Sequence, residues 1–199
     1  MNSQAGRATG AGPRWSPWES QVAIAALLGV EMALFVGTVV NKVDRKGRVS
    51  VPASFRAALA GQSFTGIVAF PSFKHPALEC CAIDFMERLG QSLYEVDTFS
   101  DRQDDLAATI FAEAHQLPFD SEGRIMLPQP LMAHAGITEI AAFVGQGPRF
   151  QIWEPRAREA FAAEARERVR RQNMTLRVKP PQSAPAEVKG DAGESGDAP

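Results

Sequence analysis

The amino-acid sequence predicts an α+β fold with a mostly β core, built from two related modules in tandem with short helices. Three observations support this fold class. The pattern D-x-x-G-R-[VI]-x-[VL]-P begins at Asp44 and again at Asp120. Apolar residues alternate with polar residues around each copy, which is typical of half-buried strands. A proline ends each copy and leads into a short amphipathic segment, which is typical of a helix.

Each position of the repeated pattern meets a physical requirement of a tight turn. The aspartate can accept hydrogen bonds from the turn backbone, and the glycine can adopt a positive φ. The aliphatic residues fill the inward face, and the proline suits the first turn of the next helix. Each copy is therefore predicted to be a hairpin that leads into a helix. Because one short hairpin cannot bury its apolar face alone, the two copies are expected to pack about a pseudo-twofold axis.

The remaining elements are predicted from hydrophobic periodicity and from helix start and stop signals. After the first copy the sequence indicates a helix over 52–59, strands over 64–70 and 78–83, and helices over 84–94 and 101–115. A capping box of Asp84 with Glu87 is expected to start the helix over 84–94. After the second copy it indicates a helix that begins at Pro128 and ends at Gly136, strands over 141–144 and 150–153, and a helix from Pro155 to about Arg171.

These motifs together resemble the MraZ family, whose chains contain two swapped-hairpin modules of the AbrB/SpoVT kind, a double-psi type. The segment Met32-Ala33-Leu34-Phe35-Val36-Gly37 is similar to the start of those chains, and the resemblance extends through the helix after Trp153. It implies a sequence-specific DNA-binding transcriptional regulator that binds repeated promoter boxes upstream of the division and cell-wall gene cluster. It also implies a ring-shaped homo-oligomer that is cytoplasmic and nucleoid-associated.

Composition and resemblance together divide the chain into six segments. These are a flexible leader or mis-assigned start (1–31), a first SpoVT-AbrB-like module (36–85), a helical connector (86–114), a second SpoVT-AbrB-like module (115–158), a C-terminal helix and edge (159–179) and a disordered tail (180–199). Glu31 interrupts the apolar run before Met32, which argues against a signal peptide or a membrane span. We expect Met32 to be the natural start, with a genuine N-terminal extension as the alternative.

Charge and cysteine content limit the possible functions. The formal net charge is −2 at pH 7, so any contact with double-stranded DNA must come from a local basic patch rather than from a basic domain. The two cysteines, Cys80 and Cys81, are adjacent and cannot readily join distant segments. A reducing compartment such as the cytoplasm is therefore expected.

The first repeated turn is the predicted DNA-binding site. The cations that surround its single acidic residue, Asp44, are Lys42, Arg45, Lys46 and Arg48. The second turn has only Arg124, against Asp120 and Glu122. A two-stranded ribbon fits the major groove, where arginine can bind guanine with two donors. The predicted DNA-binding set is therefore Lys42, Arg45, Lys46, Arg48 and Arg124. Alternatively, Arg48 and Arg124 stabilise their own turns by pairing with Asp44 and Asp120.

The sequence contains no recognisable catalytic motif. His75, His115 and His134 lack metal-ligand spacing, and there is no phosphate-binding loop or dinucleotide fingerprint. No enzyme activity, cofactor or metal is therefore expected. The alternative function is a non-enzymatic oligomeric scaffold or interaction protein with incidental DNA binding, which the nearly neutral global charge favours. The basic run from Arg156 onward is interleaved with glutamates and is interpreted mainly as a solvated helix face.

Overall fold

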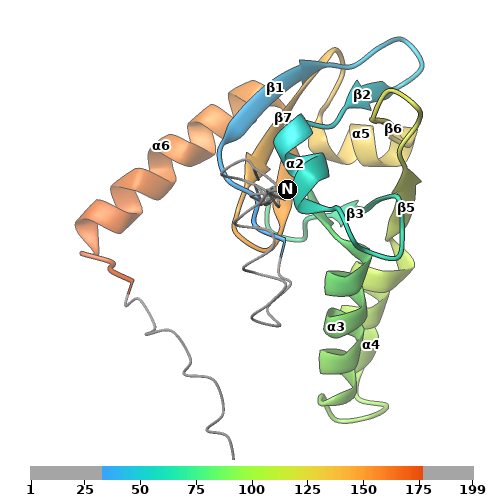
Figure 1. Ribbon diagram of the computed structural model, residues 1–199. Helices are drawn as coiled ribbons and strands as arrows, with labels where there is room; N and C mark the ends of the chain where they lie inside the picture. Colours follow the sequence, from blue (N-terminus) through green and yellow to red (C-terminus); the bar gives the residue numbers. More distant parts are fainter. Residues whose placement is uncertain (1–32, 177–199) are drawn as a thin grey trace, which may run out of the picture. The chain divides into compact units, whose positions relative to one another are not determined.

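A computed structural model of the chain describes residues 33–176 (Figure 1). The predictions about residues 1–31, about Met32 as the start and about the tail over 180–199 therefore lie outside the described residues. The chain divides into two compact units, one ending at Ala162 and one beginning at Ala163. Within the described part of the chain, no helix has both the length and the apolar character needed to cross a membrane.

The elements follow one another in an order that repeats. The first set is β1 (Thr38–Lys42), β2 (Arg48–Ser50), α2 (Ala53–Ala58), β3 (Gly66–Pro71) and β4 (Ala77–Cys81). Three helices follow: α3 (Ile83–Tyr94), α4 (Asp101–Leu106) and the π-helix η1 (Ala107–Ala112). The second set is β5 (His115–Pro118), β6 (Arg124–Met126), α5 (Gln129–Ala135), β7 (Ile140–Gly145), β8 (Phe150–Trp153) and α6 (Pro155–Arg171).

Strand pairing links the two sets. A six-stranded antiparallel sheet has the order β1-β7-β8-β4-β3-β5, and β2 pairs with β6 in a separate two-stranded sheet. The counterparts in the two sets are β1 and β5, β3 and β7, and β4 and β8. Exchanging each strand for its counterpart gives the same strand order read from the other edge. Strands β1 and β2 do not form a ladder with each other. Their segments meet at the isolated Val43–Val49 bridge, and the Asn41 side chain donates to the Ser50 carbonyl at 2.7 Å, whereas the ladders of β1 and β2 are made with β7 and β6. This exchange fits the swapped hairpin that the resemblance implies. The predicted α+β fold with a mostly β core is confirmed, and the division into modules stays an interpretation.

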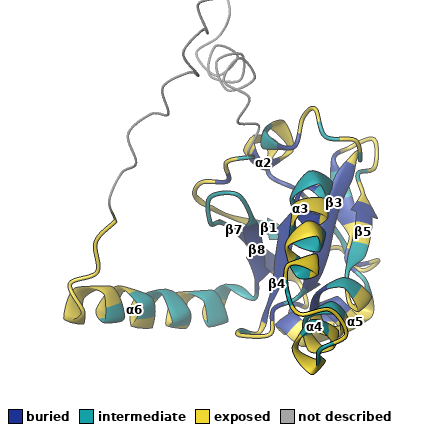
Figure 2. Ribbon diagram, turned by 90° about the horizontal axis from the view of Figure 1, so that it is seen from below, coloured by how far each residue is buried: buried dark blue, intermediate teal, exposed yellow. Residues whose placement is uncertain are grey.

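A shared aromatic cluster lies at the centre of the largest buried core. The ring centroid of Phe150 lies 4.8 Å from that of Phe35 and 5.1 Å from that of Phe55. Phe143 packs beside them, also fully buried. Figure 2 shows the inner strands of the large sheet (β7, β8, β4 and β3) as mostly buried and helix α3 as partly exposed. Because these rings come from both sets of elements, the two sets share one hydrophobic core.

Local predictions succeeded at the second copy. Gly136 ends α5 in the left-handed conformation with φ of 64°, as the stop signal predicted. Strand β8 covers the predicted residues 150–153, and α6 covers Pro155–Arg171. Phe150 and Trp153 are buried core residues.

Two predictions about the connecting helices were wrong. The capping box of Asp84 and Glu87 does not form, because α3 begins after Ala82 and has no side-chain cap. The helix predicted over 101–115 is too long, because it passes into η1, which ends at Ala112. His115 instead pairs with Ala69 in the ladder between β5 and β3. Tertiary strand pairing therefore overrides the helical periodicity at this boundary.

Candidate nucleic-acid interface

The first turn, residues 44–48, is closed by backbone hydrogen bonds at both ends. The Asp44 nitrogen donates to the Arg48 carbonyl at 2.9 Å, and the Gly47 nitrogen donates to the Asp44 carbonyl at 2.9 Å. The Asp44 Oδ1 atom accepts from the backbone nitrogens of Lys46 at 2.9 Å and Arg48 at 3.0 Å. Gly47 has a φ of 79°. The aspartate and glycine of the pattern therefore have the roles in the turn that the sequence predicts.

Arg48 is oriented by the same aspartate. Its Nε and Nη2 atoms both lie 2.7 Å from the Asp44 Oδ2 atom. Hydrogen bonds from the Arg48 backbone nitrogen and then from its side chain lower the pKa of Asp44 from 3.8 to about 2. The carboxylate therefore stays ionised at neutral pH and holds the guanidinium over the turn.

The second turn repeats this geometry, with one further acidic partner. The Asp120 Oδ1 atom accepts from the backbone nitrogens of Glu122 and Arg124, each at 2.9 Å. Arg124 donates from Nε to Asp120 at 2.7 Å, and its Nη1 atom lies 2.7 Å from the Glu122 carboxylate. The hydrogen bond with Asp120 raises the pKa of Arg124, with smaller contributions from Glu122 and Asp44. The hydrogen bond from the Arg124 backbone nitrogen is the main cause of a lowered pKa at Asp120.

The two turns lie against one another. The Leu127 nitrogen donates to the Gly47 carbonyl at 2.9 Å, and the Val51 nitrogen donates to the Gly123 carbonyl at 3.1 Å. Strands β2 and β6, which leave the turns, pair in antiparallel register. The sequence repeat therefore produces one surface from two distant segments, and the charges of the two turns are combined on it.

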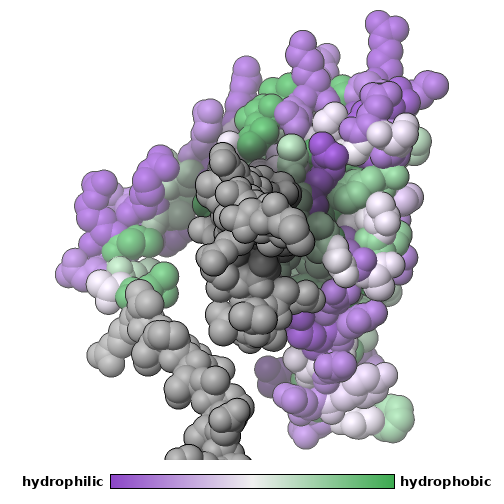
Figure 3. All heavy atoms as spheres, in the orientation of Figure 1, coloured by the Kyte–Doolittle hydropathy of each residue, from purple (hydrophilic) through white to green (hydrophobic). Residues whose placement is uncertain are grey.

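The predicted cations differ in how they are engaged. Lys42, Arg45 and Lys46 are exposed and form no ion pair within residues 33–176. Arg45 and Lys46 belong to the turn, whereas Lys42 is the last residue of β1 in the large sheet. Figure 3 shows hydrophilic side chains projecting over the connection between β1 and β2. The first turn thus has cations available to a ligand, whereas the single arginine of the second turn faces two carboxylates.

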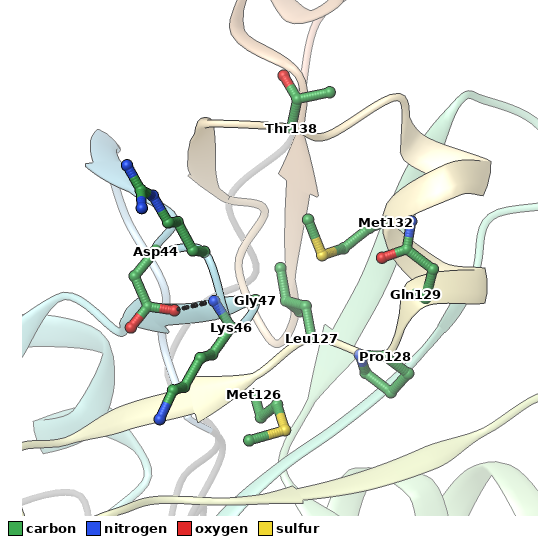
Figure 4. Close-up of a pocket in the computed structure, with 10 residues that line it drawn as sticks. Asp44, Lys46, Gly47, Met126, Leu127, Pro128, Gln129, Met132 and Thr138 are labelled. Carbon is green, nitrogen blue, oxygen red and sulfur yellow. Dashed lines mark hydrogen bonds between the residues drawn. The ribbon is translucent and has the colours of Figure 1, made fainter.

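A hollow of about 520 Å³ lies beside the first turn. Its polar wall includes Asp44, Arg45 and Lys46, and Met126 and Met132 come from the other side (Figure 4). Sequence reasoning missed Met126, which is 58% exposed. Its place in the second copy of the pattern indicated only an outward-facing strand residue, because the register between β2 and β6 was not known.

Other reactive groups do not form a second site in the part of the chain that the structure describes. No three His, Cys, Asp or Glu side chains there are grouped to hold a metal ion. Cys80 and Cys81 are buried free thiols in β4. Burial is the main reason that the pKa of Cys81 rises to about 12, so this thiol is not a reactive thiolate.

Comparisons with known proteins agree with the repeated pattern. Residues 110–178 match the family described as "MraZ protein, putative antitoxin-like". The chain is 46% identical over 146 residues to "Transcriptional regulator MraZ" of Rickettsia canadensis, an alignment that covers 73% of this chain and 98% of the relative. The protein of the same name from Rickettsia felis is 44% identical with the same coverage. The one from Rickettsia bellii is 44% identical over 137 residues, with 69% of this chain and 91% of that relative covered. Because the chain spans nearly the whole length of these relatives, it belongs to the MraZ family.

Proposed function

We propose that this chain is a sequence-specific DNA-binding regulator of transcription that acts on repeated promoter boxes upstream of the division and cell-wall gene cluster. The relatives that are named as transcriptional regulators support the general role. The observation that carries the proposal is the first turn, where Asp44 orients Arg48 beside the exposed cations Arg45 and Lys46. In this role the protein is not an enzyme, and it is located in the cytoplasm with the nucleoid.

The cations in and beside the turn have two different roles in DNA binding. Lys42, Arg45 and Lys46 neutralise phosphates, which supplies affinity that does not depend on sequence. Arg48 contacts a base edge, because its guanidinium is held in one orientation. The Nη1 atom forms no hydrogen bond within the described residues, so it remains available to a guanine acceptor in the major groove.

Arg124 has a different role in this proposal. Asp120 and Glu122 both contact its guanidinium, so we assign Arg124 to the support of the second turn. Direct contact between Arg124 and DNA stays a prediction. Arg124→Ala separates the two roles. A support role predicts lower thermal stability and an affinity that changes by the same factor for all DNAs. Base contact predicts loss of promoter preference.

Assembly into a ring-shaped homo-oligomer completes the proposed mechanism. One turn with a few phosphate contacts binds weakly, about micromolar or poorer at physiological salt. Several turns that engage repeated boxes at once would raise the overall affinity by about a hundredfold or more. Bound promoter boxes would then block or alter access of the polymerase to the promoter.

The experiment that tests this function measures the salt dependence of DNA binding by the full chain. The logarithm of affinity for promoter DNA from upstream of its own gene should fall linearly with the logarithm of salt concentration. Each of Lys42→Ala, Arg45→Ala and Lys46→Ala should reduce that slope by about one per bound subunit and weaken binding to all sequences alike. Arg102→Ala, in the connecting helix α4, is the matched control. Unchanged slopes in all three variants would favour the scaffold alternative.

A further inference from the structure

The two-stranded sheet of β2 and β6 has a clear division between its faces. Val49 and Ile125 pair in register, each is 1% exposed, and both lie in the largest core cluster. The residues on either side of them point the other way, because successive side chains of a strand alternate faces. The outward pairs are Arg48 with Met126 and Ser50 with Arg124. This outward face combines residues of both sequence copies.

Met126 is the apolar member of this outward face. It is 58% exposed, and it belongs to none of the three buried hydrophobic clusters in the described chain. Its register partner is Arg48, and it shares the wall of the hollow with Lys46 (Figure 4). The counterpart of Met126 in the first copy is Ser50, so the repeat itself does not require an apolar residue here. Burial within the described unit therefore does not explain the methionine.

Distance places Met126 within reach of whatever Arg48 contacts. Residues directly opposite in an antiparallel pair have Cβ atoms about 5 Å apart, which lies between one base-pair step of about 3.4 Å and two such steps. A ligand that contacts the Arg48 guanidinium from the solvent side therefore also meets the methionine. In the major groove, the apolar group that base edges present is the methyl group of thymine. A flexible and polarisable thioether suits such a contact.

We propose that Met126 is a specificity-determining residue that makes an apolar contact with the methyl group of a thymine next to the base pair that Arg48 contacts. This inference rests on the proposed function and deepens it. The base-reading surface then consists of an arginine from the first copy of the pattern and a methionine from the second. The asymmetry between Met126 and Ser50 means that the two ends of the ribbon favour different bases.

The test uses the full chain and two duplexes of the same promoter DNA, one with thymine and one with uracil at every thymine position. Uracil keeps the base pairing and lacks only the methyl group. The unmodified chain should bind the uracil duplex at least about threefold more weakly, the expected effect of one lost methyl burial per bound subunit. Met126→Ala should bind the thymine duplex more weakly and treat the two duplexes alike. Met126→Leu should retain the thymine preference.

Arg45→Ala is the matched control, because it changes the same hollow without removing the apolar group. It should bind both duplexes more weakly and keep the thymine preference. A Met126→Ala chain with the same preference as the unmodified chain would overturn the inference. A lower oligomeric mass of Met126→Ala by light scattering would overturn it too, because the methionine would then act at a subunit contact.

The same titration distinguishes this inference from the function on which it rests. Preference for promoter over shuffled DNA without any thymine dependence would overturn the role of Met126 alone. Absence of promoter preference in the unmodified chain would overturn the proposed function and this inference together.

Discussion

Arg48 donates to Asp44 through Nε, and the donor lies 2.7 Å from the carboxylate Oδ2 atom. The two side chains are 34% and 39% exposed, so their ion pair adds little to the stability of the fold. Its main consequence is the orientation of the guanidinium, because a carboxylate and an arginine fix each other's direction. Substitutions of Asp44 and Arg48 separate this orienting role from simple charge attraction.

Asp44→Asn should reduce sequence preference although it removes a negative charge beside DNA. Asparagine can still accept backbone hydrogen bonds in the turn, but it no longer holds Arg48 with a charge. We expect the ratio of promoter to shuffled affinity to fall on the order of tenfold, while affinity for shuffled DNA stays equal or rises. Competition titrations with the two DNAs measure this ratio. A purely electrostatic role for the turn predicts stronger binding to both DNAs and an unchanged ratio.

Acid should weaken the fold partly through Asp44. Its pKa is lowered from 3.8 to about 2 in the folded chain, so the folded state binds fewer protons there than the unfolded state does. The contribution of Asp44 to stability is therefore present above about pH 4 and is lost as the pH falls toward 2. Thermal unfolding across this range should show a shallower decline for Asp44→Asn than for the unmodified chain. Asp97→Asn, an exposed acid before α4, serves as the control, and an equal decline in all three proteins would refute the linkage.

Glu79 is expected to be important for stability because it is a buried carboxylate with three partners. It accepts hydrogen bonds from Arg149 and Gln151, each at 2.6 Å, and from the Ser72 hydroxyl at 3.0 Å. Glu79→Ala leaves these donors without their acceptor in the middle of the large sheet. The free energy of unfolding should fall by about 3 kcal/mol.

Urea denaturation at a fixed protein concentration measures the Glu79 effect. Glu167→Ala removes one member of an exposed ion pair with Arg170 and should change stability by less than about 0.5 kcal/mol. Similar losses in the two variants would mean that the buried network contributes no more than a surface pair does.

Two glycine substitutions should have opposite effects on stability. Gly47 has a φ of 79°, and an added Cβ would lie 3.0 Å from the Leu127 carbonyl oxygen, so Gly47→Ala should cost at least about 1 kcal/mol. Gly90 lies inside helix α3, where an added Cβ would lie 3.6 Å from the Phe111 ring, an ordinary contact. Gly90→Ala should therefore stabilise the chain by about 0.5–1 kcal/mol. Thermal unfolding midpoints compare the two, and a stabilised Gly47→Ala variant would contradict the geometry of the turn.

Local chemistry made the two turns and the end of α5 predictable from the sequence. Asp44 and Gly47 act within a few residues of each other, and Gly136 ends α5 through its own backbone conformation. The partner of each strand was harder to predict from the sequence, because alternation of apolar residues identifies a strand without identifying its neighbour. The pairing of β1 with β7 therefore emerged only from the structure. The capping box at Asp84 failed for a related reason, since the start of α3 is determined by the end of β4.

The candidate site was predictable to the same extent. The pairing of Arg48 with Asp44 is local, and the sequence already offered it as an alternative to DNA contact. The structure shows this pairing, and the orienting role that we propose makes it compatible with DNA contact. Met126 comes from a segment far along the chain, so only the register of β2 with β6 places it opposite Arg48. Sequence patterns therefore indicated the cations of the surface and missed its apolar member.

The central claim is that the first turn reads promoter sequence through Arg48. It is tested most directly by titrating the full chain, Arg48→Ala and Lys46→Ala with promoter DNA from upstream of its own gene and with a shuffled control. Light scattering would confirm that each variant keeps its oligomeric mass. We predict that the unmodified chain prefers promoter DNA, that Arg48→Ala loses the preference, and that Lys46→Ala weakens binding to both DNAs. Equal binding of promoter and shuffled DNA by the unmodified chain, or an unchanged preference in Arg48→Ala, would contradict the account.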